Sequence, residues 1–212
     1  MTGRLIVCPT PIGNLEDVTL RVLSALRDAD VVACEDTRRT RVLLERYGVQ
    51  AALVSYHEHN EAARASELVR RMQDGTVVAL VSDAGMPLVS DPGYLLVQGC
   101  IAAGLEVEVL PGPSAVMAAL VASGLPTDAW RFVGFLTRKK TALLATLSSP
   151  ETIVAFESPN RVKATLAALE PDRPVAVCRE LTKLHEEVLR GTAAELAGRV
   201  EPRGEVVLVI GG

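Results

Sequence analysis

At 212 residues the chain is long enough for one large domain or two compact ones, and its 49% hydrophobic and 23% charged residues exclude a disordered or fibrous protein. A net charge of −4 argues against binding polyanions through the overall field, so any contact with a nucleic acid must rest on local patches. No apolar run reaches the roughly 20 residues of a membrane-spanning helix and no signal peptide is evident, so we expect a cytosolic protein.

Short β-branched runs alternate with amphipathic stretches in the first half of the chain. Ala65, Leu68 and Met72 recur at helical spacing, which predicts a helix over 61–74 that stops at Gly75. Because parallel strands cannot be joined by tight turns, the alternation indicates a mainly parallel sheet covered on both faces. The predicted strands are 5–8, 31–34, 52–55, 77–81 and 107–110.

The second half is expected to be built from similar elements. A helix is predicted over 114–123, with Gly124 and Pro126 ending it. Thr192 and Glu195 form a capping box that opens the last helix, because each side chain can satisfy a free backbone donor. The predicted strands are 132–136, 152–156, 175–178 and 206–210.

Pro111-Gly112-Pro113 marks the predicted boundary between two lobes. A glycine bracketed by prolines between a strand and a helix indicates a hinge. We therefore place residues 1–111 in an N-terminal α/β lobe and residues 112–212 in a C-terminal α/β lobe.

Neither the cysteines nor the histidines form a convincing metal-binding pattern. Cysteines stand singly, without the spacing of a zinc site or a disulfide framework, and we expect reduced, mostly buried thiols. They are Cys8, Cys34, Cys100 and Cys178. His57-Glu58-His59 suggests a metal site, but alternate residues face one way only along a continuing strand, and Asn60 starts a helix. We expect no metal.

The segment 82–93 is the most unusual loop in the sequence. Ligands of open α/β sheets bind at the carboxyl ends of strands, so loops that follow apolar runs are the candidate sites. This one has a dozen residues, including two carboxylates, where most such connections have about 2–6. Asp91 is predicted to cap a helix that begins at Pro92 and ends at Gly104, but a cap does not explain the length of the loop.

Two further loops follow predicted strands of the first half. The segment 9–15 has neither a Walker lysine nor the three-glycine dinucleotide pattern, so nucleoside triphosphates and NAD are disfavoured as ligands. The segment 111–115 places backbone amides at a helix start, where they could hold a carboxylate or a ribose. An ordinary turn and a simple N-cap at Ser114 are the alternatives.

Charged residues gather where strands of the second half begin or end. Charges in such positions often line clefts, although a solvated ion-pair network is the alternative. They include Glu157, Arg161, Arg179, Glu180 and Lys183.

Basic residues cluster at Arg38, Arg39 and Arg41 and at Arg138-Lys139-Lys140, where they could grip phosphates. Most charge runs are solvated faces, which is the alternative. Aromatic residues make up only 3% of the chain, so binding through phosphates is favoured over stacking on single strands.

The motifs at 9–15, 35–38, 82–93, 111–115, 157–159 and 179–183, taken together, resemble one family. It is the small-subunit ribosomal RNA cytidine 2′-O-methyltransferases of the tetrapyrrole methylase superfamily, and the resemblance runs from Leu5 to Ile210. It implies a class III methyltransferase with two α/β lobes, S-adenosylmethionine and the active site in the cleft between them, and a homodimer that methylates ribosomal RNA in the small ribosomal subunit.

The resemblance also implies site residues. The expected cofactor pocket draws on Pro11, Asp83, Gly85, Met86, Pro87, Val89, Ser114, Ala115, Phe156 and Leu181. The polar side chains expected around the acceptor are Asn14, Asp36, Arg38, Glu157, Arg161, Glu180 and Lys183. Glu157 and Lys183 are the leading candidates for a general base, because burial and neighbouring charges can tune either.

The chain departs from the family at several positions. Met86 stands where a threonine is usual, so this segment is expected to bind mainly through its backbone, and Asn160 replaces a common histidine. The basic loop after Leu136 is shorter than usual, and the chain ends at Gly212 without the C-terminal extension of many members. Two other functions stay open: C-methylation of a corrin or porphyrin precursor, and RNA binding without catalysis.

Overall fold

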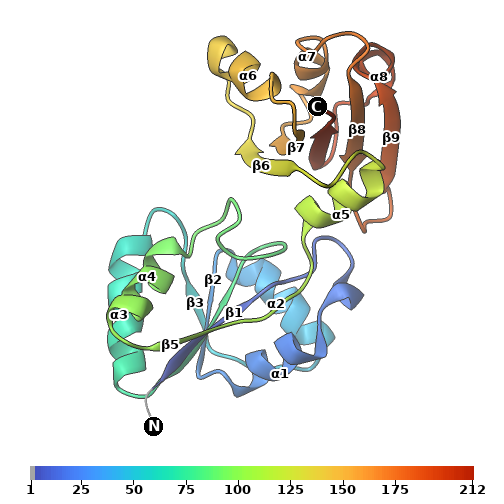
Figure 1. Cartoon of the computed structure of the whole chain (residues 1–212). Coiled ribbons are helices and arrows are strands. Elements are labelled where there is room, and N and C mark those ends of the chain that lie inside the picture. The colour runs from blue at the N-terminus through green and yellow to red at the C-terminus, as the bar shows by residue number, and fades with distance from the viewer. Residues whose placement is uncertain (1–2) are drawn as a thin grey trace. The chain divides into compact units, whose positions relative to one another are not determined.

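The chain divides into two compact units, Met1–Ser114 and Ala115–Gly212, in a computed structural model that describes residues 3–212 (Figure 1). Each unit has its own five-stranded sheet and its own hydrophobic core. The units are called unit 1 and unit 2 below.

The sheet of unit 1 is parallel throughout, as predicted. Its strands run in the order β3-β2-β4-β1-β5, and β1 pairs with both β4 and β5 in parallel. The central strands are buried on both faces, which explains why they are continuous apolar runs in the sequence. The strands are β1 (Arg4–Cys8), β2 (Val31–Cys34), β3 (Leu53–Ser55), β4 (Val77–Val81) and β5 (Glu106–Val109).

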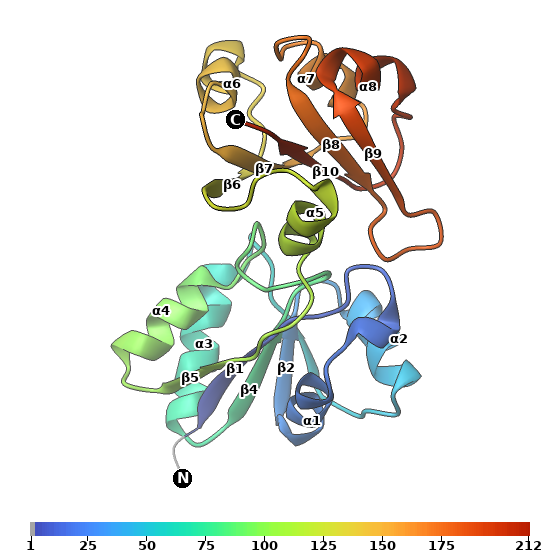
Figure 2. The same cartoon turned by 45° about the vertical axis from the view of Figure 1, so that its right-hand side comes forward.

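Helices cover both faces of this sheet (Figure 2). Side chains alternate along β1, so Ile6 packs against α1 (Leu20–Asp28) and α2 (Thr37–Arg46), while Leu5 packs against α3 (Glu61–Gln73) and α4 (Tyr94–Ala102). A short 3-10 helix, η1 (Leu15–Asp17), precedes α1. The predicted helix over 61–74 is confirmed as α3, with Gly75 behind it at a φ of 102°.

The sheet of unit 2 is mixed, which contradicts the expectation that both halves are built alike. Its order is β6-β7-β10-β8-β9, and among the paired neighbours only β6 and β7 pair in parallel. Strand β9 was not predicted, because its six residues form a partly exposed edge with no apolar run. It pairs with β8 as an antiparallel neighbour, so Arg179 faces Glu187. The strands are β6 (Trp130–Phe135), β7 (Thr152–Glu157), β8 (Pro174–Arg179), β9 (Glu187–Thr192) and β10 (Val206–Ile210).

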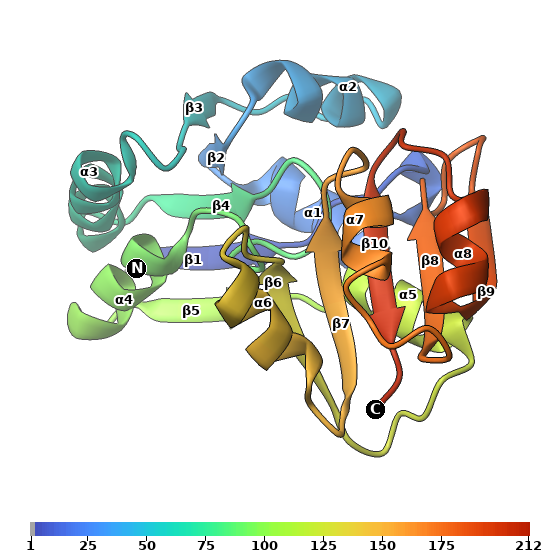
Figure 3. The ribbon, with the colours of Figure 1, turned by 90° about the horizontal axis from the view of Figure 1, so that it is seen from above.

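Three helices cover one face of this sheet: α6 (Lys140–Leu147), α7 (Val162–Leu166) and α8 (Ala193–Arg199) (Figure 3). Helix α5 (Ala115–Ser123) packs on the other face, where the Cys178 thiol reaches the Ala119 carbonyl at 3.9 Å. The capping box of Thr192 and Glu195 is confirmed at the start of α8.

The prediction for the start of α4 is wrong. The helix begins at Tyr94, and its N-cap is Gly93 rather than Asp91. The cap comes instead from Glu61 at the start of α3, whose Oε1 accepts hydrogen bonds from the Gly93 amide at 2.9 Å and the Leu95 amide at 3.2 Å. A carboxylate there also interacts favourably with the positive N-terminal end of the helix dipole. This cap lies more than 30 residues upstream, so a local sequence rule cannot find it.

The four cysteines are unpaired and buried, as expected. Within residues 3–212, no three His, Cys, Asp or Glu side chains are arranged to hold a metal ion. In the same part of the chain, every helix is too short or too polar to cross a bilayer.

Replacing Gly93 with alanine is expected to destabilise unit 1 by about 2–4 kcal/mol. Its φ of 140° favours glycine, and an added Cβ would lie 2.7 Å from Leu88 Cδ1 and 2.9 Å from Leu80 Cδ2. The matched control is Gly104→Ala. Gly104 also has a positive φ, of 67°, but no atom lies within 4 Å of an added Cβ, so this substitution should cost only about 1 kcal/mol. Urea unfolding measures both, and equal losses would contradict the steric argument.

Candidate functional site

Four loops leave the sheet of unit 1 at one edge, because the strands they follow are parallel. We call them the strand-end loops. They are 9–14 after β1, 35–36 after β2, 82–93 after β4 and 110–114 after β5.

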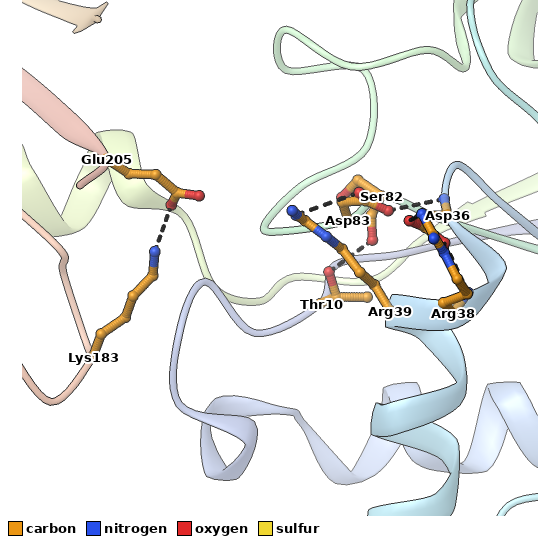
Figure 4. A network of polar contacts seen from close by, with 8 residues as sticks. All are labelled: Thr10, Asp36, Arg38, Arg39, Ser82, Asp83, Lys183 and Glu205. Atoms are coloured by element: carbon orange, nitrogen blue, oxygen red, sulfur yellow. Dashed lines mark hydrogen bonds and ion pairs between the residues drawn. The ribbon is translucent and has the colours of Figure 1, made fainter. Parts of the chain in front are cut away.

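The loops after β1 and β4 are joined through their main chains. The Thr10 amide donates to the Gly85 carbonyl at 2.8 Å, and the Gly85 amide donates to the Thr10 carbonyl at 2.9 Å. The Thr10 hydroxyl also donates to the Ser82 carbonyl at 3.0 Å (Figure 4). A Cβ on Gly85 would lie 3.3 Å from Ile12 and 3.7 Å from Pro113, so three of the four loops meet at this glycine.

Asp83 joins the loop after β4 to the loop after β2. Its Oδ1 accepts the Asp36 amide at 3.0 Å, and its Oδ2 lies 3.4 Å from an Arg39 nitrogen (Figure 4). Asp36 in turn caps α2 and forms an ion pair of 2.8 Å with Arg38. Hydrogen bonds from the side chain and amide of Arg38 lower the pKa of Asp36 to about 2, so this carboxylate is ionised at neutral pH.

Three carboxylates influence one another at the same edge. Burial, followed by the negative charges of Glu35 and Asp83, raises the pKa of Asp91 to about 6. Burial and Asp83 likewise raise the pKa of Glu35. Glu35 and Asp91 are not among the predicted site residues, and the sequence pattern predicts only a helix cap for Asp91. Together these carboxylates place negative charge at the strand-end loops, beside the cations of Arg38 and Arg39, and negative charge suits a cationic ligand.

Backbone strain is confined to two of the predicted loops. Among residues 3–212, the non-glycine residues with positive φ are Leu88 at 71°, Ser90 at 67°, Glu180 at 53° and Thr182 at 65°. The first two lie after β4 and the last two after β8. Such conformations cost of order 1–3 kcal/mol each and cluster at functional sites, so they favour a binding role for both loops.

In unit 2, an ion-pair network links the residues after β8 to the start of β10. Glu180 Oε1 accepts the Glu205 amide at 2.8 Å and the Lys183 ammonium at 3.0 Å. Lys183 also lies 2.9 Å from Glu205 Oε2 (Figure 4). Burial alone would lower the pKa of Lys183, but its hydrogen bonds to Glu205 and Glu180 outweigh burial and raise it. Lys183 is therefore a cation at neutral pH.

Glu157, at the end of β7, is a fully buried carboxylate with partners on both oxygens. Oε1 accepts the Ser158 amide at 2.7 Å and lies 3.5 Å from Arg161, while Oε2 accepts the Thr165 hydroxyl at 2.6 Å. Arg161 also donates to the carbonyls of residues 136 and 137 at 2.9 and 3.0 Å. Both predicted site residues thus hold the end of β7 to the loop after β6.

The other predicted residues lie on the same loops and strand ends. Pro11, Met86, Pro87, Val89 and Ser114 belong to the strand-end loops of unit 1, and Ala115 begins α5. Asn14 accepts the Glu16 amide at 3.0 Å and so caps η1. Phe156 packs its ring 5.0 Å from Phe132, and Leu181 is buried between the two strained residues after β8.

Comparison with known proteins gives one consistent result. The sequence model of the family described as Tetrapyrrole (Corrin/Porphyrin) Methylases matches residues 4–197. A "Ribosomal RNA small subunit methyltransferase I" of Mesorhizobium japonicum is 49% identical over 98% of this chain and 74% of its own length. One of Thermotoga maritima is 46% identical over 99% of both chains. A uroporphyrin-III C-methyl transferase from Thermus thermophilus, solved with S-adenyl homocysteine, shares the fold at 22% identity, with a TM-score of 0.68 over 99% of this chain and 97% of its own.

Replacing Asp91 with asparagine is expected to remove a pH-dependent loss of stability. The folded protein keeps the Asp91 proton up to pH about 6, whereas the unfolded chain releases it near pH 4. The folded state therefore binds more protons between these values, and the wild-type free energy of unfolding falls as pH rises through this window. Urea unfolding from pH 3.5 to 7.5 should show Asp91→Asn gaining stability relative to wild type up to about pH 6 and staying constant above it.

Asp36→Asn is the control of opposite sign, because the lowered pKa of Asp36 means that its carboxylate stabilises the fold above about pH 4 and loses this contribution only as pH falls toward 2. Its difference from wild type should therefore stay constant from about pH 4.5 to 7.5, where that of Asp91→Asn changes. A constant difference between wild type and Asp91→Asn over the whole range would refute the burial argument.

Proposed function

Since the chain belongs to the tetrapyrrole (corrin/porphyrin) methylase family, and within it to the relatives named ribosomal RNA small subunit methyltransferase I, we propose that it transfers a methyl group from S-adenosylmethionine to ribosomal RNA of the small subunit. The observation that carries this proposal is 46–49% identity to those relatives over almost the whole chain. We propose the ribose 2′-oxygen of a cytidine as the acceptor and a homodimer as the working form, which the resemblance of the motifs implies.

The strand-end loops of unit 1 fit the chemistry of this cofactor. S-adenosylmethionine supplies an activated methyl group on a sulfonium, so its reactive centre is positively charged. The carboxylates of Glu35, Asp83 and Asp91 provide the matching negative potential. Gly85 is buried, and its amide and carbonyl bond to Thr10, so it fastens two of the loops together. Met86 offers no hydroxyl, so we propose that the rest of segment 85–89 binds through its backbone. Roles of Ser114, Ala115, Phe156 and Leu181 in cofactor binding stay predictions.

Because the methyl group arrives activated, the protein mainly has to orient the acceptor hydroxyl and stabilise the charge that develops as its proton leaves. We propose that Lys183 does this as an ammonium ion, because its raised pKa makes it a poor base at neutral pH. Glu180 and Glu205 position the ammonium. The hydroxyl proton then passes to one of these carboxylates or to water.

Glu157 is proposed to position the end of β7 rather than to accept the proton, because both of its oxygens are occupied and its side chain is 0% exposed. Arg161 shares this positioning role. Asn14, Asp36 and Arg38 stay predicted contacts of the acceptor RNA, and the exposed Arg38 side chain can move to a phosphate.

Replacing Lys183 separates the charge role from the base role. Lys183→Ala is expected to lower kcat by about 10²–10³-fold while the Kd for S-adenosylmethionine stays unchanged. Lys183→Arg should keep a larger part of the rate, because arginine remains cationic and cannot lose its proton. Arg199→Ala, an exposed change on α8, is the control. If Lys183→Arg is as slow as Lys183→Ala, the charge role is excluded.

The function itself is tested by transfer of a labelled methyl group to purified small ribosomal subunits. We expect label in one cytidine nucleotide, located by nuclease digestion and mass spectrometry. Label on a corrin or porphyrin precursor, with none on the subunits, would favour the tetrapyrrole acceptor instead. Calorimetry that detects no binding of millimolar S-adenosylmethionine would contradict any methyltransferase activity.

A further inference from the structure

A pocket of about 540 Å³ lies in unit 2 at the carboxyl end of β7. We call it the β7–α7 pocket. The loop after β6, helix α6, the turn after β7 and helix α7 all contribute to it. Its lining includes Arg138, Leu143, Ser158, Asn160, Arg161 and Thr165.

Three side chains of the pocket are available to a ligand. Arg138 is exposed and has no ion-pair partner within the described chain, and the same residues provide no hydrogen-bond partner for the side chains of Ser158 and Asn160. One guanidinium, one hydroxyl and one amide form a donor set suited to the oxygens of a phosphate.

The wall of the pocket is held in place by residues whose polar groups already have hydrogen-bond partners within unit 2. Arg161 donates to the carbonyls of Leu136 and Thr137, which fixes the loop that carries Arg138. Thr165 donates to the buried Glu157 carboxylate at 2.6 Å, which fixes α7 against the end of β7. The donors of Arg138 and Ser158 are therefore attached to a braced frame, which lowers the entropy lost when a ligand binds.

The local charge is positive although the chain as a whole is negative. Between residues 136 and 166 there are five cations and two carboxylates. Glu157 is buried beside Arg161, and Glu151 lies 3.9 Å from Arg131. Among residues 3–212, Arg138, Lys139, Lys140 and Lys163 have no carboxylate partner. Lys139 and Lys140 follow Arg138 directly in the chain, and Lys163 precedes the lining residue Ala164. Several cations next to the pocket suit a ligand with successive negative charges better than a single small anion.

We propose that the β7–α7 pocket binds a backbone phosphate of an RNA strand, with Arg138 as its charged partner and Ser158 and Asn160 as neutral donors. The identity of the RNA rests on the proposed function, whereas the phosphate site rests on the geometry of unit 2. The residues that line the pocket include no carboxylate that could hold a cation, and the nearby Glu157 is buried with both oxygens occupied.

The test is binding of purified small ribosomal subunits to the full chain across 50–300 mM KCl. Arg138→Ala is expected to weaken binding about tenfold at 100 mM KCl and to reduce the slope of log Kd against log salt by about one. Asn160→Ala should weaken binding about twofold to fivefold without changing the slope, because it removes no charge. The control is Arg199→Ala, which removes the same charge from an exposed position on α8 and should match wild type in both respects.

Equal affinity and slope for Arg138→Ala and Arg199→Ala would overturn the phosphate site. Competition by polyglutamate as strong as that by RNA would overturn it too, in favour of an acidic protein partner. Methyl transfer is measured in parallel: a wild-type chain that binds subunits but transfers no label refutes the proposed function and leaves the comparison of variants valid. The Kd for S-adenosylmethionine is expected to be the same in all variants.

Discussion

The parallel pairing of β1 with β4 and β5 is the constraint on which the candidate site of unit 1 depends. It brings every loop that follows a strand to the same edge of the sheet, where main-chain bonds between Thr10 and Gly85 fasten two of them together. Asp83 then fixes a third through the Asp36 amide. Once the loops are fastened in this way, Asp91 is partly buried and lies near the carboxylates of Glu35 and Asp83. Its raised pKa, caused first by burial and then by these charges, is therefore a consequence of topology.

In unit 2, a different strand pairing brings the candidate site residues together. Strand β10 runs antiparallel between β7 and β8, so its first residues lie beside the last residues of both neighbours. This places Glu205 against Glu180 and lets Lys183 bind both carboxylates. The positive φ of Glu180 is stabilised by these contacts, since the surrounding structure must offset the strain of a left-handed backbone.

Burial separates residues of the same type into different roles. Glu157 and Glu180 both follow apolar strands, yet Glu157 is enclosed and has donors on both oxygens, whereas Glu180 shares a partly exposed lysine with Glu205. A carboxylate of the first kind braces the backbone. One of the second kind can contact a ligand, because it and its lysine are partly exposed.

Local rules predict part of this structure from the sequence. Continuous apolar runs such as 31–34 and 77–81 indicate buried parallel strands, the pair Thr192 and Glu195 indicates a helix start, and the long loop at 82–93 indicates the candidate site. The long-range partners are visible only in the folded chain: the cap that Glu61 supplies to α4, the antiparallel order around β10 and the edge strand β9. Propensities and caps act over a few residues, whereas these contacts join segments far apart in the chain, and no local pattern encodes such a distance.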